Sequence, residues 1–199
     1  LGGGRCGDHK ALVGRQARAP ERGPVPTQAE PGRRDRLFVG NEPDPAVTRY
    51  VAMCERMLWT VGGGSVRRWL AGRGFDDELL RVNHVGADPG RSLLPRRRGL
   101  PPGFAVAAVF PALDEGGAVR YVQARSLEPG DGPKYFNPAA TLAGNPRLAW
   151  TATVQACEPG VMVICEGIPD ALTAAQAGYP AVAVLGSHAP DAAVALRLA

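Results

Sequence analysis

The sequence predicts a mixed α and β fold, in which helices and an antiparallel hairpin precede a βαβ unit. Three patterns carry this prediction. Apolar residues recur at helical spacing between residues 44 and 82, an apolar run and an alternating run flank a glycine turn between 104 and 127, and two apolar runs flank a helical pattern between 161 and 185. The 199 residues suffice for one ordinary domain or two small ones.

The first part of the chain predicts a tail followed by helices. Residues 1–43 carry glycine, proline and arginine without a sustained period, which indicates a disordered tail or linker. A helix of about four turns is expected to open at Pro45, because proline suits a first helical position. The glycines 62–64 end it. Ser65 is the expected cap of a short second helix, which Gly74 stops.

The middle of the chain changes from the helical period to the strand period. Asp76 is the expected N-cap of a third helix, with Leu79 and Leu80 facing inward. Residues 104–110 (FAVAAVF) then predict one strand and residues 119–127 (VRYVQARSL) a second, joined by a turn at a glycine pair. The hairpin is followed by a polar loop that prolines stiffen.

The last part predicts two parallel strands around a helix. Residues 161–165 (VMVIC) form a continuous apolar run, which is typical of a strand covered on both faces. Pro169 opens a helix that Gly178 ends, and residues 181–185 predict the second buried strand. Ligands of such a unit bind at the carboxyl edge of the sheet, where Glu166 emerges.

Composition excludes several classes of protein. No apolar run approaches the roughly 20 residues of a membrane span, so no membrane partner is expected. The net charge of +4 says little about partners, because 21 of the 23 basic residues are arginines, a bias typical of GC-rich coding sequences. The 4 cysteines stand alone, which argues against disulfides and zinc and favours the cytoplasm.

Two carboxylates suggest a site for a hard cation. Glu166 follows a buried strand and Asp170 comes four residues later, so both are expected near one crevice. Mg²⁺ or Mn²⁺ prefers such oxygen ligands, and phosphoryl transfer uses the metal to neutralise phosphate charge. The alternative is that Glu166 is a solvated turn residue and Asp170 stabilises the helix dipole.

Three blocks of the sequence resemble one enzyme family in the same order. One block resembles the first half of a TOPRIM domain: VICEGIPDALTAAQAGYPAVAVLGS. TOPRIM domains are the Mg²⁺-dependent modules of DnaG-type primases, topoisomerases and some nucleases. The helical segment of the primase core resembles SVRRWLAGRGFDDELLRVNHVGADPG, and its basic subdomain resembles AVFPALDEGGAVRYVQARSLEPGDGPKYFNPA. The resemblance implies an α+β primase catalytic core over residues 44–150, with a helical segment and an antiparallel basic subdomain. An incomplete α/β TOPRIM βαβ unit follows over residues 151–199.

The resemblance implies a DNA primase, a DNA-directed RNA polymerase that makes short RNA primers on single-stranded DNA from ribonucleoside triphosphates. A replicative helicase is a further candidate partner. Three alternatives stay open: a primase-helicase fusion of a phage or mobile element, a TOPRIM nuclease, and a non-catalytic relic that binds single-stranded DNA. The fragment alone is expected to be inactive.

Site residues follow from the same resemblance. Glu166 resembles the TOPRIM glutamate of acid/base chemistry at the metal site, and Asp170 the acid that follows it. Arg125 and Lys134 resemble residues that face nucleotide and template, and Asn137 the polar residue after the KY pair. A lysine in an arginine-rich chain supports a phosphate contact for Lys134, because a compact ammonium suits a phosphate. The alternative is an exposed loop lysine.

A run of three arginines is a further candidate for template contact. Arg96, Arg97 and Arg98 lie between the helical and basic blocks, either as a solvated loop or as a patch for template phosphates. Such grooves combine positive charge with aromatic stacking surfaces. The stacking candidates are Phe104, Tyr121, Tyr135 and Phe136.

Two features depart from the family pattern. A TOPRIM site is completed by an Asp-x-Asp pair on a third strand, whereas only 13 residues follow Gly186 and the last nine predict a helix. The remaining metal ligands are therefore expected outside this chain, which leaves a sheet face or edge exposed. The segment RCG-x-HKALV resembles the last knuckle of a primase zinc ribbon, but one cysteine cannot bind zinc by itself.

Overall fold

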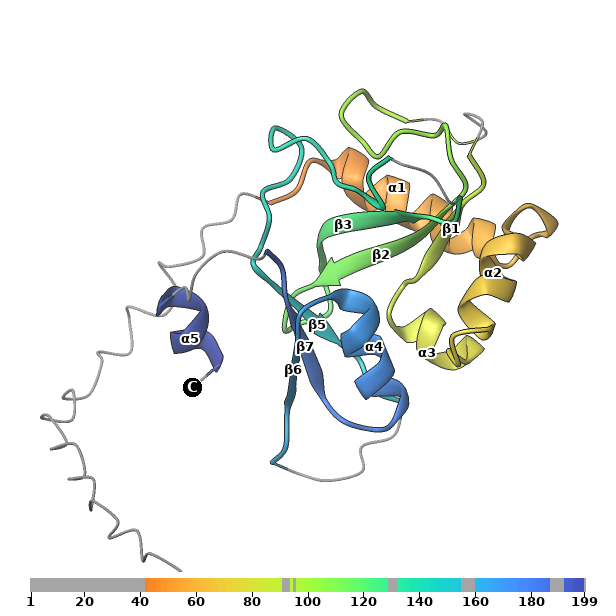
Figure 1. Ribbon diagram of the computed structural model, residues 1–199. Helices are drawn as coiled ribbons and strands as arrows, with labels where there is room; N and C mark the ends of the chain where they lie inside the picture. Colours follow the sequence, from red (N-terminus) through yellow and green to blue (C-terminus); the bar gives the residue numbers. More distant parts are fainter. Residues whose placement is uncertain are drawn as a thin grey trace, which may run out of the picture. The chain divides into compact units, whose positions relative to one another are not determined.

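The computed structural model describes residues 42–90, 94, 96–128, 132–154, 160–186 and 192–198. The predicted tail lies almost wholly outside these residues. The elements in chain order are α1 (Pro45–Leu58), the 3₁₀ turn η2 (Val61–Gly63), α2 (Gly64–Ala71), α3 (Asp77–Val82), β1 (Gly86–Asp88), β2 (Ala107–Leu113), β3 (Val119–Ser126), β4 (Tyr135–Phe136), β5 (Leu148–Thr151), β6 (Val163–Cys165), α4 (Ile168–Gln176), β7 (Ala181–Val184) and α5 (Ala192–Leu198) (Figure 1).

One seven-stranded sheet runs through the described chain in the order β4-β3-β2-β5-β7-β6, with β1 also paired to β2. The predicted β2–β3 hairpin is confirmed as an antiparallel pair, and β6 and β7 are parallel, as the βαβ prediction requires. All seven residues of β2 are buried, so both faces of this strand are covered. The sheet therefore joins the hairpin and the βαβ unit directly.

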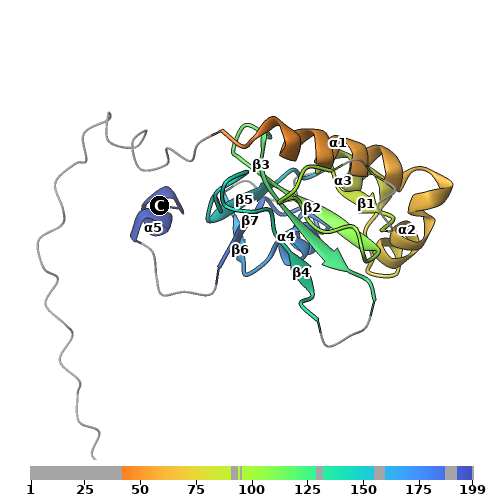
Figure 2. The same ribbon diagram turned by 90° about the horizontal axis from the view of Figure 1, so that it is seen from above.

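Helix α1 begins and packs as its sequence predicts. The Asp44 side chain accepts a hydrogen bond from the Ala46 N–H at 2.9 Å, and proline occupies the first turn. The apolar stripe of α1 packs on β1, β2 and β3, and Figure 2 shows the helix along one side of these strands. Gly86 permits the close approach, because a Cβ there would lie 2.6 Å from the backbone carbon of Cys54.

The start of α2 differs from the prediction. Ser65 lies inside the helix, and the N-cap is Gly63, which provides no side-chain hydrogen bond. Gly62 and Gly63 lie in η2, and Gly64 is the first residue of α2. Gly63 lies so close to the backbone of Leu58 that a Cβ would be 2.6 Å from its Cα. The predicted cap of α3 is confirmed, since the Asp76 carboxylate accepts from the Leu79 N–H at 2.7 Å.

The strands differ from the prediction at their ends and in number. Strand β2 begins at Ala107 rather than Phe104, whose side chain is exposed. The short strands β1, β4 and β5 were not expected. Strand β6 is not covered on both faces as predicted, because it is an edge strand and Ile164 is 55% exposed. The expectation of an exposed sheet edge is confirmed there.

Strand β5 connects the two halves of the sheet. It pairs with β7 through four residue pairs and with β2 through Leu113 and Trp150 alone. The domain boundary predicted at residue 150 falls inside this strand, and it stays a prediction. A second apolar cluster covers the β5–β7 pair, where Leu148 and Val182 pack with Val194 of α5.

Side-chain bonds tie the helical segment to the rest. The Asn83 side chain exchanges hydrogen bonds of 2.9 Å and 2.8 Å with the backbone of Ala152 after β5. Between α3 and α4, Gln176 accepts from the Asp76 N–H at 2.9 Å and donates to the Asp76 carboxylate at 2.6 Å. These bonds fix α3 against the βαβ unit.

Candidate nucleic-acid interface

Strands β3 and β4 place Arg125 between two aromatic rings. Arg125 lies opposite Tyr135 in the register of these strands, so the two side chains share one face of the sheet. The guanidinium carbon lies 5.5 Å from the ring centre of Tyr135 and 5.2 Å from that of Trp69 on α2. Arg125 also donates a hydrogen bond of 3.3 Å from Nη1 to the Tyr135 hydroxyl.

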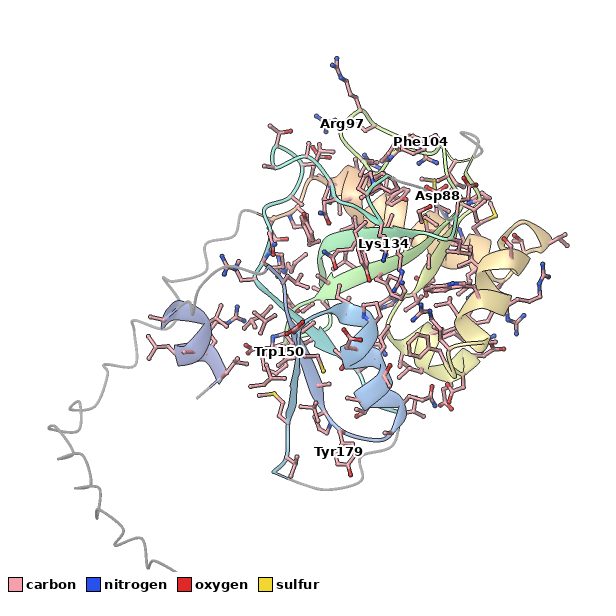
Figure 3. All side chains as sticks on the ribbon, viewed as in Figure 1. Asp88, Arg97, Phe104, Lys134, Trp150 and Tyr179 are labelled. Atoms are coloured by element: carbon pink, nitrogen blue, oxygen red, sulfur yellow. The ribbon has the colours of Figure 1, made fainter. Side chains whose placement is uncertain are left out.

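Arg125 and Lys134 line a common pocket of about 620 Å³. The exposed Lys134 is held through its backbone, since its carbonyl accepts from the Ser126 N–H at 2.9 Å. Figure 3 shows Lys134 over the β2–β3 pair. The other residues that line the pocket are Trp69, Phe104, Ala105, Ser126, Leu127, Glu128, Gly132, Pro133 and Phe136.

Two phenylalanines give the pocket an aromatic wall. The rings of Phe104 and Phe136 meet edge to face, with their centres 5.2 Å apart and their planes at 84°. Phe104 is 69% exposed, so most of its ring is available to a ligand. Among the described residues, the lining of the pocket thus combines two cations and one carboxylate, Glu128, with aromatic faces. Single-stranded nucleic acids bind to surfaces of this kind, through phosphates on the cations and bases stacked on the rings.

Two further residues that were predicted to contact nucleic acid, Asn137 and Tyr121, differ in exposure. Asn137 is exposed beside the pocket and accepts a hydrogen bond of 3.3 Å from the Gln123 side-chain amide. A contact between Asn137 and a nucleotide stays a prediction. Tyr121 is buried in the core at 6% exposure. It is therefore wrong as a stacking surface, because β3 turns this ring away from solvent.

The arginine run does not form one basic surface. Arg96 turns inward and donates to both carboxylate oxygens of Asp88, at 2.8 Å and 3.1 Å. Asp88 is 1% exposed and also accepts from the Tyr50 hydroxyl at 2.8 Å. Arg96 donates further to the Pro101 carbonyl at 2.8 Å. This placement contradicts the predicted phosphate contact of Arg96, because the buried carboxylate already binds its guanidinium.

Burial and the Asp88 charge control titration at this ion pair. Burial raises the pKa of the Tyr50 hydroxyl and of the Cys54 thiol above their usual ranges, and the negative charge of Asp88 raises both further. Burial alone would lower the pKa of Arg96, but the Asp88 carboxylate more than offsets this and raises it. Arg96 therefore stays charged, and its guanidinium pairs with the Asp88 carboxylate inside the protein.

Arg97 and Arg98 remain on the surface. Arg97 forms an ion pair with Asp44, the N-cap of α1, and its side chain stays 58% exposed. Arg98 is exposed as well. Template contact by these two arginines stays a prediction.

The predicted metal ligands lie at the carboxyl end of β6. Glu166 and Asp170 are both exposed there. An Asp170 carboxylate oxygen lies 3.3 Å from the position that a Cβ on Gly167 would take. The pKa of Cys165 is raised, first by burial and then by the Asp170 charge, which places Asp170 close to the end of the strand.

The donor set at this edge consists of two carboxylates. Within the described residues, no group of three or more His, Cys, Asp or Glu side chains could hold a metal ion together. Two exposed carboxylates fit an Mg²⁺ ion that is held jointly with substrate phosphates, since such ions commonly use one or two protein carboxylates. They do not fit an all-protein cage. The segment around Cys6 and His9, which resembles a zinc knuckle, lies outside the described residues.

Sequence reasoning missed Trp69, which holds one side of the pocket. The tryptophan stood within the block that resembles the helical segment, but nothing in the spacing of α2 indicates that it meets β3. A signal was available in the composition, because the chain has only 3 tryptophans.

Another structural finding concerns membranes: no helix in the described ranges is both long enough and apolar enough to span one.

Solved structures of DnaG primases resemble the fold. The DnaG primase catalytic domain bound to single-stranded DNA matches with a TM-score of 0.57 and 23% identity, over 76% of this chain and 58% of that chain. The RNA polymerase domain of Mycobacterium tuberculosis primase DnaG, in complex with a double-stranded DNA oligomer with a 6-nucleotide overhang, matches with a TM-score of 0.58 and 22% identity, over 76% and 56%. The E. coli primase catalytic core matches with a TM-score of 0.53 and 22% identity, over 72% and 54%.

This chain has the fold of a DnaG primase catalytic core. It spans between 54% and 58% of the length of the three chains described above. Neither a family model nor a curated protein matches the sequence. The pocket between α2, β3 and β4 therefore lies on a primase-type fold, and its chemistry follows from its own residues.

Proposed function

We propose that the chain is the catalytic-core part of a DnaG-type primase, which synthesises RNA primers on single-stranded DNA. One observation carries the proposal: a pocket with two cations and three aromatic side chains, among them the exposed Phe104, lies on the β3–β4 part of a primase-type fold. The pocket supports binding of a single strand, because it offers partners for both phosphates and bases. A helicase partner and a helicase fusion stay predictions from the sequence.

In the proposed reaction a primer 3′-hydroxyl or an initiating nucleotide attacks the α-phosphate of a ribonucleoside triphosphate, and pyrophosphate leaves. Arg125 and Lys134 would bind phosphates of the template or nucleotide and hold them in position. Glu166 would accept the proton of the attacking hydroxyl. Glu166 and Asp170 would hold Mg²⁺ or Mn²⁺ together with the substrate phosphates, and the ion would supply neutralisation of phosphate charge.

The test of the pocket is Lys134→Ala in the complete protein. Removal of one phosphate-binding cation should lower the slope of log affinity against log salt by about 0.7, the single-strand value for one contact. Primer synthesis should fall further than binding, because a cation placed on a reacting phosphate contributes more in the transition state than in the ground state. Binding is measured by fluorescence anisotropy of a labelled oligonucleotide, and synthesis by incorporation of labelled ribonucleotides.

Arg67→Ala is the matched control for loss of a cation. Arg67 pairs with Asp77 and contacts Trp59, and it does not line the pocket. It should leave the salt slope and primer synthesis unchanged. Equal effects of Lys134→Ala and Arg67→Ala on both measurements would contradict the proposed pocket.

The test of the acidic edge is Glu166→Gln. Primer synthesis should be lost while the affinity for single-stranded DNA stays close to that of the wild type, since Glu166 is not among the described residues that line the pocket. Unchanged synthesis in Glu166→Gln would remove the proposed catalytic role. Binding without any synthesis in the wild-type protein would instead support the hypothesis of a non-catalytic DNA-binding relic.

A further inference from the structure

Trp69 occupies an unusual place between the helical segment and the pocket. It lies on α2, where it is half-buried and packs against the core, and it also lines the pocket. Two guanidinium groups contact its ring. The Arg73 group lies 4.2 Å from the ring centre, and the Arg125 group lies 5.2 Å from it.

Arg125 is held by groups that leave most of its donors available. Among the described residues its contacts are the faces of Trp69 and Tyr135 and the Tyr135 hydroxyl, rather than a carboxylate. A guanidinium has five N–H donors, and an indole ring attracts the cation without accepting these donors at a lone pair. The rings therefore restrict the side chain while its hydrogen-bonding capacity remains for a ligand.

We propose that Trp69 and Tyr135 act as a positioning pair, which holds the Arg125 guanidinium ready for a phosphate of the bound strand. This inference rests on the proposed function of the pocket. A free arginine side chain has many rotamers, and their loss on binding weakens affinity. An arginine already confined by rings from α2 and β4 loses less freedom when the phosphate arrives. The effect reaches the strand through Arg125.

The chain provides a matched control at Trp59. Its ring also meets two arginines, with the Arg67 group 4.8 Å and the Arg81 group 3.9 Å from the ring centre. Neither arginine lines the pocket. Trp59 therefore repeats the ring chemistry of Trp69 without access to the proposed ligand.

The experiment is a double-mutant cycle in the complete protein. Trp69→Leu keeps an apolar side chain on α2 and removes the ring. It should weaken binding of a labelled single-stranded oligonucleotide by about three- to tenfold, the range expected for one arginine that must be immobilised on binding. In the Arg125→Ala background the same change should have no further effect. The template KM of primer synthesis should rise in Trp69→Leu, with a smaller change in kcat.

Two companion variants separate positioning from packing. Trp69→Phe retains an aromatic face and should restore most of the affinity that Trp69→Leu loses. Trp59→Leu should leave affinity and KM unchanged. Should Trp69→Leu fail to fold, Tyr135→Ala completes the same cycle from β4, and its loss should likewise disappear in the Arg125→Ala background.

The outcomes separate this inference from the proposed function. Losses that persist in the Arg125→Ala background would mean that the rings bind bases directly, which overturns the positioning role and leaves the pocket intact. Equal behaviour of Trp69→Leu and Trp59→Leu, with Arg125→Ala still defective in binding, would also overturn it alone. Wild-type affinity in Arg125→Ala and Lys134→Ala would overturn the proposed pocket itself.

Discussion

Arg96 and Arg125 were both predicted to contact nucleic acid, and the fold uses them in opposite ways. Arg96 donates to both oxygens of a buried carboxylate and to a backbone carbonyl, and its side chain is 15% exposed. Arg125 lies between two aromatic rings at the rim of a pocket, where its recorded hydrogen bond goes to a hydroxyl. The partner of an arginine, rather than its place in a basic run, decides whether its hydrogen-bond donors are used by the fold or remain available.

The variant Arg96→Ala tests whether Arg96 stabilises the fold. This change should destabilise the protein by about 3–5 kcal/mol, because it leaves the Asp88 charge buried without its partner. Chemical denaturation monitored by circular dichroism measures the loss. The neighbouring Arg97→Ala is the control, since Arg97 is mostly exposed. A loss in Arg96→Ala no larger than that in Arg97→Ala would contradict a structural role for the Asp88 pair.

A smaller loss of stability is expected when a side chain crowds the Arg96 guanidinium. A Cβ on Gly103 would lie 2.4 Å from the guanidinium carbon of Arg96, which the bonds to Asp88 hold in place. Gly103→Ala should therefore destabilise the protein by about 1–3 kcal/mol, the usual range for overpacking. Gly116→Ala is a suitable comparison, because the contact there is 3.4 Å and involves an exposed turn. Equal stability of the two variants would argue against the rigid position of Arg96.

Loss of the Arg125 side chain should have a smaller effect on stability than loss of the Arg96 side chain. Arg125→Ala removes two ring contacts, and each is worth about 0.5–1 kcal/mol at an exposed site. We expect a loss of about 1–2 kcal/mol in denaturation, together with a clear loss of affinity for single-stranded DNA. A loss as large as that of Arg96→Ala would remove the distinction between the two arginines.

The smallest effect concerns Arg97 and depends on pH. The pKa of Asp44 is lowered from its ordinary value of 3.8, first by the hydrogen bond from the Ala46 N–H, which outweighs the opposing effect of burial. The Arg97 guanidinium lowers this pKa further. A carboxylate with a lowered pKa stabilises the fold above its ordinary pKa, and this contribution is lost as pH falls through the folded value. Arg97→Ala should therefore melt slightly below the wild type at neutral pH.

The difference between the two melting temperatures should close as the pH falls below 3.8, where Asp44 takes up a proton. Differential scanning calorimetry over this range measures it. A difference that grows towards acid pH would mean that Arg97 stabilises the fold through another group.

Much of the fold could be predicted because local chemistry determines it. The proline at the start of α1 and the Asp76 cap depend on residues within a few positions of each other, and the parallel β6–β7 pair follows from the order strand, helix, strand. The strands β1, β4 and β5 could not be predicted in this way. They have only two to four residues, which is too short to show an alternating pattern of their own.

The site was predictable from the resemblance in one respect. Arg125 and Lys134 were expected in one groove, and they line one pocket. The fate of Arg96 was not predictable, because its partner Asp88 becomes buried only when α1 and β1 pack together. Trp69 was missed for a similar reason, since its contact with Arg125 joins α2 to β3 across 56 positions of the sequence.

We expect the narrow pairing between β2 and β5 to divide the sheet into two cooperative units. A single residue pair joins these strands, whereas β2 and β3 share seven pairs. Amide protons of the β2–β3 hairpin should therefore exchange with solvent at a rate that reflects global unfolding. The amide protons of β5, β7 and β6 should exchange through a partial opening between β2 and β5, which costs less free energy than global unfolding. Hydrogen-exchange mass spectrometry would then give two protection levels, with the Asn83–Ala152 and Asp76–Gln176 bonds setting the interval between them.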